Sequence, residues 1–334
     1  MNTQTQATRQ AHEPQGNLPA SLQEGQLKRS DRTIGIVGLG HMGSALARSL
    51  AADGHQVLAF DRDFSRASVL KGVGVGPVQS LAALSDCEAI VTSLPDDDAL
   101  SAVVRDGDGL LDCMQAGAVH ISMSTISPGL SQELANDHAT RAQHYVAAPV
   151  LGNPDLARDR KLFVLAAGDP ESMAKARPLL DRFGQRLFLL GEKASQANLM
   201  KLAGNVLTAI TLESMGEVLA LLRKSGMDQH LAFEVLTNSL FDSKVHRTYG
   251  GKIVDERYSP AGMAVPLAVK DVRLALAEAE RQAVPMPAAS LVHDRLVGLV
   301  AAGHAALDWS ALGLLAARDA GLPFEAGRST TADR

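Results

Sequence analysis

The stretch from Thr33 to Arg62 constrains the fold of this chain more than any other segment. Ile34–Val37 is an apolar run too short for a helix, and it ends in a G-x-G-x-x-G sequence, where a buried parallel strand would be followed by a helix. In that setting the glycines permit a tight turn, close approach of a pyrophosphate, and close packing of helix on strand. The segment therefore predicts a dinucleotide-binding turn formed by Gly38, Leu39, Gly40, His41, Met42 and Gly43.

The residues after the glycine motif fit the same unit. A helical pattern ends at Gly54, and Gln56–Phe60 is typical of a second strand. Asp61 follows this strand, 18 residues after Gly43, where a carboxylate can accept hydrogen bonds from an adenosine ribose. A structural glycine turn with an ordinary surface aspartate is the alternative. The matching order of strand, turn, helix, strand and acid favours the nucleotide site.

The acid also bears on the choice of cofactor. The Asp61 carboxylate would accept from a 2′-hydroxyl and repel a 2′-phosphate, so the sequence favours NAD(H). Arg62 could instead swing onto a 2′-phosphate, which leaves NADP(H) open as the second choice. Both residues are therefore predicted to contact the cofactor.

The composition of the whole chain excludes several classes of function. Its 334 residues suffice for two packed domains, and its net charge of −5 lacks the basic excess of a nucleic-acid-binding protein. Cys87 and Cys113 form no C-x-x-C pair, and the acidic run 96–98 fits a helix cap better than a metal site, so no metal is predicted. No apolar run approaches the ~18 residues of a membrane span. We expect a cytoplasmic protein without a membrane partner.

Further strands extend the pattern of a doubly wound, mainly parallel α/β sheet. One strand ends at Leu94 and Pro95, and the next is followed by a hydroxyl-rich turn that contains Ser124 and Thr125. Further on, the runs His144–Val150 and Lys161–Ala167 are also predicted as strands. Ligands bind outside the carboxyl ends of such strands, so we expect Leu94, Pro95 and Thr125 near the cofactor. A simple capping turn is the structural alternative for the serine and threonine.

Beyond Gly191 the pattern changes from strands to long helices. Residues 193–224 form a helical pattern of about 48 Å that is apolar on several sides, as in the core of a helical domain or of a homodimer or homotetramer. We therefore predict a solvated tail over residues 1–30, a dinucleotide-binding domain over 31–191, and an all-helical substrate and dimerisation domain over 192–330.

Two polar features stand out on these helices. Lys201 and Asn205 lie four residues apart, hence on one face of the long helix, with Gly204 beside them. Lys270 and Asp271 begin a later helical run. The structural alternative for a helical lysine is a solvated charge, and the apolar neighbours of Lys201 make that alternative less suitable there than at Lys270.

The sequence resembles the β-hydroxyacid dehydrogenases, a family that includes 3-hydroxyisobutyrate dehydrogenase, tartronate semialdehyde reductase and the glyoxylate/succinic semialdehyde reductases. The resemblance implies an N-terminal Rossmann domain and an all-α domain joined by a long helix. It extends from Thr33 to about Gly321. Four blocks carry it: Gly38–Gly43, Met123–Pro128, Lys201–Asn205 and Lys270–Leu274.

The resemblance also implies residue roles in hydride transfer between a nicotinamide and a small hydroxy acid, aldehyde or keto acid. Lys201 would be the general acid/base on the substrate oxygen, and Asn205 would orient the substrate. Ser124 and Thr125 would bind the substrate carboxylate, with Ser124 counted among the catalytic residues. Lys270 would close the site near the cofactor.

One block departs from the family pattern. Where the family usually has D-A-P-V-S-G-G, residues 147–153 read A-A-P-V-L-G-N, so a polar substrate loop is replaced by a more apolar one that keeps Gly152 as a predicted substrate contact. Two alternative functions differ at the helical block. NADPH-dependent imine reductases usually lack the Lys-x-x-x-Asn pair, and a non-catalytic dinucleotide-binding scaffold would be expected to lose the lysine. Lys201 and Asn205 favour carbonyl chemistry.

Overall fold

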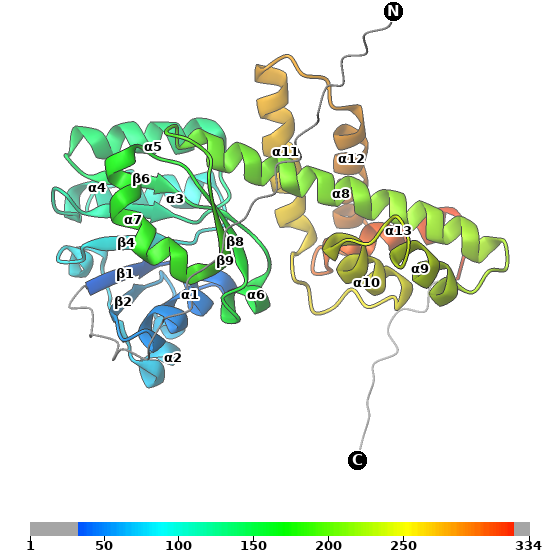
Figure 1. Ribbon diagram of the computed structural model, residues 1–334, viewed down its shortest axis with the longest axis horizontal. Helices are drawn as coiled ribbons and strands as arrows, with labels where there is room; N and C mark the ends of the chain where they lie inside the picture. Colours follow the sequence, from blue (N-terminus) through cyan, green and yellow to red (C-terminus); the bar gives the residue numbers. More distant parts are fainter. Residues whose placement is uncertain (1–32, 324–334) are drawn as a thin grey trace, which may run out of the picture.

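The computed structural model describes residues 33–323, so the predicted tail over residues 1–30 lies outside the described part. An α/β domain and an all-helical domain are joined by one long helix, α8 (Ser195–Lys224), which begins against the first domain and runs through the second (Figure 1). The predicted combination of a Rossmann-type domain with a helical domain is confirmed.

A six-stranded sheet forms the core of the first domain, in the order β3-β2-β1-β4-β5-β6 with every neighbouring pair parallel. Its strands are short, and β1, β4, β5 and β6 are almost wholly buried, as expected for a sheet covered on both faces. Strand order reverses between β1 and β4, which is where an open α/β sheet binds its ligand. The strands are β1 (Thr33–Val37), β2 (Gln56–Phe60), β3 (Val75–Pro77), β4 (Ala89–Thr92), β5 (Val119–Ser122) and β6 (His144–Ala147).

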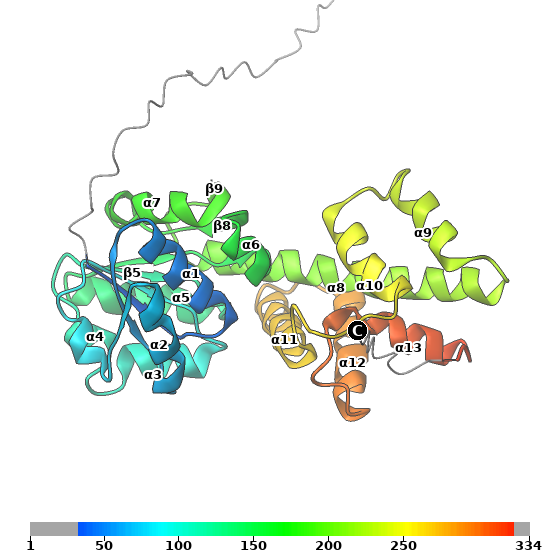
Figure 2. The ribbon, with the colours of Figure 1, turned by 90° about the horizontal axis from the view of Figure 1, so that it is seen from below.

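Helices cover the sheet on both sides (Figure 2). Four of them begin with an aspartate or serine whose side chain accepts from a first-turn amide, including Asp96, which accepts from Ala99 N at 2.8 Å as its sequence position predicts. The helical elements are α1 (His41–Ala52), α2 (Phe64–Val69), η1 (Leu70–Val73), η2 (Leu81–Leu84), α3 (Asp97–Arg105), α4 (Leu110–Cys113), α5 (Pro128–Thr140), α6 (Pro154–Arg158) and α7 (Pro170–Phe183).

A second, smaller sheet packs against α8, and here the strand prediction was incomplete. The apolar run from His144 to Val150 is not one strand, because Pro149 has no amide hydrogen for the ladder. The chain leaves the large sheet after β6 and pairs again in a three-stranded sheet of order β7-β8-β9. Its strands are β7 (Val150–Leu151), β8 (Leu162–Ala166) and β9 (Gly184–Leu189).

The helical domain packs around α8, with α9 and α10 on one side and α11, α12 and α13 on the other (Figure 2). Gly250 and Gly251 obscure the helical pattern of η3 and α10 in the sequence, because glycine is a poor helix former. A Cβ at Gly250 would lie 2.4 Å from Met215 Cε of α8. The elements are α9 (Gln229–Thr237), η3 (His246–Gly250), α10 (Gly251–Val254), α11 (Val265–Arg281), α12 (Pro287–Ala301), η4 (Trp309–Ala311) and α13 (Leu312–Asp319).

The sequence of helix α8 contains no continuous apolar run of membrane length. By length and composition it is nevertheless the one helix among residues 33–323 that could cross a membrane. Half of its most apolar 18-residue stretch is buried against the rest of the protein, and α13, α11 and α12 pack along the helix. These properties are those of the core helix of a packed domain.

Candidate active site

The glycine turn has the shape that its sequence predicts. Gly38 has a φ of +89°, and a Cβ there would lie 2.4 Å from the Ser93 carbonyl oxygen. A Cβ on Gly43 would lie 1.9 Å from the Gly38 oxygen, so the start of α1 packs directly on the turn. Beside Gly40 there is open space, and no side chain caps the first turn of α1. The free amides and the helix dipole there suit a pyrophosphate.

Asp61 lies immediately after β2 and holds this turn in place. Its Oδ2 accepts from the Leu39 amide at 2.7 Å, and its Oδ1 accepts from the Asp63 amide at 2.9 Å. The Arg66 guanidinium is 4.0 Å from Oδ2, and the Arg62 side chain beside it is exposed. Asp61 thus joins the glycine turn to the end of β2, where the ribose of a dinucleotide would lie.

A hydrogen bond from the loop after β4 to Ser124 joins the ends of β4 and β5. The buried Ser124 hydroxyl accepts from the Leu94 amide at 2.9 Å, and Leu94 itself packs against Gly38. The carbonyl oxygens of Pro95 and Thr125 both face the helical domain. Four predicted residues from two separate loops are therefore gathered next to the glycine turn.

The helical domain reaches these loops through a chain of four hydrogen-bonded side chains. Lys201 Nζ donates to Asn205 Oδ1 at 3.1 Å, and Asn205 Nδ2 donates to Asp271 Oδ2 at 2.5 Å. Lys270 Nζ lies 3.0 Å from Asp271 Oδ1. The same ammonium donates to Thr125 O at 2.5 Å and to Pro95 O at 2.8 Å, so this chain joins α8 and α11 to both sheet loops.

Burial and two neighbouring charged side chains set the pKa of Lys201. Burial lowers the pKa of Lys201 below its ordinary value, the Asp271 carboxylate raises that pKa, and the neighbouring Lys270 ammonium lowers it again. The net pKa is lower than that of a solvated lysine. Lys201 can therefore exchange a proton closer to neutral pH than an ordinary lysine can.

Sequence reasoning missed Asn198, which lies one turn before Lys201 and is fully buried. Its Oδ1 accepts from the Ile126 amide at 3.3 Å, and its Nδ2 donates to the Ser131 hydroxyl at 3.1 Å. Asn198 thus fixes the start of α8 to the loop that carries Thr125. An asparagine in an otherwise apolar turn of the long helix is the signal that could have identified it.

Among the described contacts of Gly152, none is with Lys201. It has a φ of +145°, and a Cβ there would lie 2.8 Å from Leu162, inside the β7–β8 hairpin. Its neighbour Leu151 is the residue of this loop that packs against α8, beside Gly204. The glycine shapes the loop, and the leucine faces the helix that carries Lys201.

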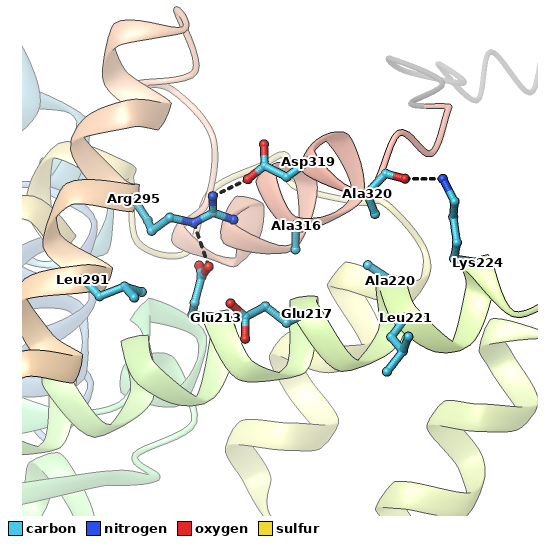
Figure 3. Close-up of a pocket in the computed structure, with 10 residues that line it drawn as sticks. All are labelled: Glu213, Glu217, Ala220, Leu221, Lys224, Leu291, Arg295, Ala316, Asp319 and Ala320. Atoms are coloured by element: carbon cyan, nitrogen blue, oxygen red, sulfur yellow. Dashed lines mark hydrogen bonds and ion pairs between the residues drawn. The ribbon is translucent and has the colours of Figure 1, made fainter.

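A separate cavity of about 520 Å³ lies within the helical domain, away from all of these residues. Figure 3 shows Arg295 between Glu213 and Asp319 at its wall, with Leu221 and Leu291 at its edges. Arg295 Nε donates to Glu213 Oε1 at 2.7 Å, while burial raises the pKa of Glu213. The cavity contains none of the predicted site residues.

Comparison with known proteins now identifies the family. Residues 33–191 match the NAD-binding domain of 6-phosphogluconate dehydrogenase, and residues 195–315 match the domain described as NAD-binding of NADP-dependent 3-hydroxyisobutyrate dehydrogenase. The chain is 36% identical to the uncharacterized oxidoreductase YfjR of Bacillus subtilis, over 84% of this chain and 98% of that protein. This chain belongs to the β-hydroxyacid dehydrogenase family.

Other β-hydroxyacid dehydrogenases agree in sequence and structure. Glyoxylate/succinic semialdehyde reductase 1 of Arabidopsis thaliana is 30% identical over 84% of this chain and 96% of its own length. The 3-hydroxyisobutyrate dehydrogenase of Salmonella typhimurium has a TM-score of 0.78 at 25% identity, covering 85% of this chain and 100% of that one.

The imine reductase alternative has weaker support. An imine reductase from Myxococcus stipitatus shares the fold with a TM-score of 0.59 at 20% identity. The predicted function, an NAD(P)-dependent oxidoreductase of the β-hydroxyacid dehydrogenase type, is confirmed at the level of the family.

Proposed function

We propose that this protein transfers hydride between NAD(H) and a small carboxylate that bears an aldehyde, a ketone or a β-hydroxyl, with Lys201 as the proton donor and acceptor. The observation that carries the proposal is the chain from Lys201 through Asn205 and Asp271 to Lys270, which ends on the carbonyls of the two sheet loops. It fixes an ionisable amine beside the edge where the nicotinamide would lie.

The residues present fit a dinucleotide. Open space beside Gly40 and the uncapped first turn of α1 would receive the pyrophosphate, and Asp61 would face the ribose. When bound, the nicotinamide supplies or accepts the hydride. The residues of this protein must bind and orient the substrate and must supply or remove the proton.

Lys201 meets the requirement for a proton. Reduction of a carbonyl develops negative charge on its oxygen, and a positioned acid there contributes about 10²- to 10⁴-fold in rate. Lys201 in its ammonium form gives this proton, and in its neutral form it withdraws the proton from the hydroxyl in the reverse direction. Its lowered pKa makes both forms accessible.

The neighbouring groups position the substrate and Lys201. The Ser124 and Thr125 side chains would offer hydroxyl donors to a carboxylate, while Lys270 holds Thr125 against α11. Asn205 uses its amide oxygen on Lys201 and an amide hydrogen on Asp271, so it holds the catalytic amine in addition to any contact with substrate.

We propose NAD(H) as the preferred cofactor. Asp61 places a carboxylate after β2, where it would accept from the 2′-hydroxyl of NAD and repel the 2′-phosphate of NADP. The exposed Arg62 and the half-exposed Arg66 are the groups that would hold a 2′-phosphate if NADP(H) were used.

We also propose that the protein is at least a dimer. Helix α8 carries large apolar side chains on its solvent side, and Leu221 and Leu291 at the cavity in Figure 3 are 65% and 52% exposed. A second copy of the chain is the partner that would cover such a surface in a homodimer or homotetramer.

The deciding experiment combines a substrate screen with Lys201 variants. Small aldehyde acids, keto acids, hydroxy acids and cyclic imines would be tested with both cofactors by nicotinamide absorbance. Lys201→Met should lower kcat about 10²- to 10⁴-fold with an unchanged cofactor Kd. Lys201→Arg is the matched control, because it keeps the charge but cannot release a proton at neutral pH.

Near-normal turnover by Lys201→Met, or a loss of cofactor binding equal to the loss of activity, would refute the assigned role. Turnover of cyclic imines but of no carbonyl compound would favour the imine alternative instead.

A further inference from the structure

We infer that the cavity in Figure 3 binds a small organic ammonium ion that carries a short alkyl chain. The inference does not depend on the proposed function, because the cavity contains none of the residues assigned to the active site. The cavity lies where α8, α12 and α13 meet, and its volume of about 520 Å³ is in the range of small-molecule sites.

Glu213 of α8 is a buried carboxylate at the wall of this cavity, and only one of its oxygens has a hydrogen-bond donor. Its side chain is 5% exposed, and Oε1 accepts from Arg295 Nε at 2.7 Å. Among the described residues, none places a donor within hydrogen-bond distance of Oε2. A buried charged oxygen without a donor costs free energy. A ligand with N–H donors in the cavity would reduce that cost.

The charges around the cavity favour a cation as this ligand. Glu217 follows Glu213 by one turn of α8, and its carboxylate lies close enough to raise the pKa of Glu213 in addition to the effect of burial (Figure 3). The Arg295 guanidinium is shared between Glu213 and Asp319, and the Lys224 ammonium donates to a backbone carbonyl. Three carboxylates and two cationic side chains therefore line the cavity, which leaves one negative charge in excess.

The remaining wall of the cavity suits an alkyl chain. Ala220 and Ala316 are small and buried, while Leu221 and Leu291 at the edges are 65% and 52% exposed. An alkyl chain that extends from the carboxylates along these residues would remove apolar surface from water. Because Glu213 is buried within a single chain, the charged end of the ligand needs no residue of a second copy, even where a second copy covers the two leucines.

Isothermal titration calorimetry with the full-length protein at neutral pH tests the inference. Butylammonium chloride should bind saturably with a Kd of about 1 mM, an ordinary affinity for a ligand of this size. Methylammonium should bind about tenfold more weakly, because it lacks the alkyl chain. Neither 1-butanol, which lacks the charge, nor tetramethylammonium, which lacks N–H donors, should bind saturably. Saturating NAD⁺ should leave the Kd of butylammonium unchanged.

Variants of the two glutamates test which carboxylates hold the ammonium. Glu213→Gln keeps an acceptor for Arg295 and should weaken butylammonium binding about 10- to 100-fold, the value of a hydrogen bond to a charged group. Glu217→Gln changes an exposed side chain and should weaken binding about two- to fivefold. Glu234→Gln is the matched control, since Glu234 is an exposed glutamate of α9 outside the cavity.

Three results would overturn the inference: no saturable binding of butylammonium, equal binding of 1-butanol, or an unchanged Kd in both cavity variants. Competition between butylammonium and NAD⁺ would also overturn it, because the amine would then occupy the active site. If Glu213→Gln does not fold, as judged by thermal unfolding, Glu217→Gln and the comparison of ligands decide the question. The proposed function is tested separately by the Lys201 variants, so either can fail alone.

Discussion

Acidification should destabilise this protein through a pair of buried histidines, His120 on β5 and His138 on α5. The Gln143 side-chain nitrogen donates to two backbone carbonyls, so its oxygen faces His138 as an acceptor, at 2.8 Å from Nδ1. His138 therefore accepts at Nε2 from His120 Nδ1 at 2.9 Å. His120 in turn accepts at Nε2 from the Thr92 hydroxyl at 2.9 Å. Each ring is neutral, with both nitrogens in use.

Protonation of His138 at Nε2 would place its N–H against the Nδ1–H of His120 in a buried site. Burial lowers the pKa of His138 from 6.5 to about 4, and burial together with His138 lowers the pKa of His120 still more strongly. The unfolded chain thus binds more protons than the folded one below pH 6.5. The stabilisation is fully present above that pH and is lost as pH falls. Between about pH 7.5 and about pH 5.0, His138 alone should remove about 2 kcal/mol from the free energy of unfolding.

Urea unfolding followed by circular dichroism at the two pH values measures this loss. His138→Gln should lose about 2 kcal/mol less than the wild type, because an amide can accept from His120 and donate to Gln143 without titrating. His230→Gln is the matched control, since His230 is 63% exposed and should leave the pH dependence unchanged. Equal losses in the wild type and in His138→Gln would refute the reasoning.

Three further outcomes are expected. Carbonyl reduction should slow as pH rises through the lowered pKa of Lys201 while alcohol oxidation speeds up, and parallel pH profiles in both directions would contradict its role. Asp61→Ser should raise the NADPH to NADH ratio of kcat/KM about tenfold or more, and a wild-type preference for NADPH would contradict the NAD assignment. Asn198→Ala should lower kcat about tenfold at unchanged cofactor Kd, and an equal loss in both would indicate a general folding defect.

The predicted dimer or larger oligomer can be measured directly as a molecular mass in solution. Light scattering at micromolar concentration should give at least twice the mass of the chain, 35.2 kDa, and a monomer mass would contradict it. If the surface around the cavity in Figure 3 is the interface, Leu221→Asp should lower the mass, while Val69→Asp on the exposed surface of the α/β domain should not.

The sequence by itself determined the first unit of the fold. Gln56–Phe60 was predicted as a strand and is β2, and the helix that ends before Gly54 is α1. These features depend on the period of apolar residues and on the backbone freedom of glycine, which are properties of a few consecutive residues. The split of His144–Val150 into β6 and β7 was missed, because it depends on which sheet each half joins.

Only the tertiary structure decided how the predicted residues work together. Asn205 and Asp271 are 66 positions apart, and Lys270 and Thr125 are 145 apart, yet each pair shares a hydrogen bond. The approach of Leu151 to Gly204 likewise follows from packing the small sheet on α8. Sequence patterns identify residues that are suited to catalysis. The neighbour that shifts the pKa of such a residue or completes the site is set by the packing of two separate domains, which local sequence propensities do not determine.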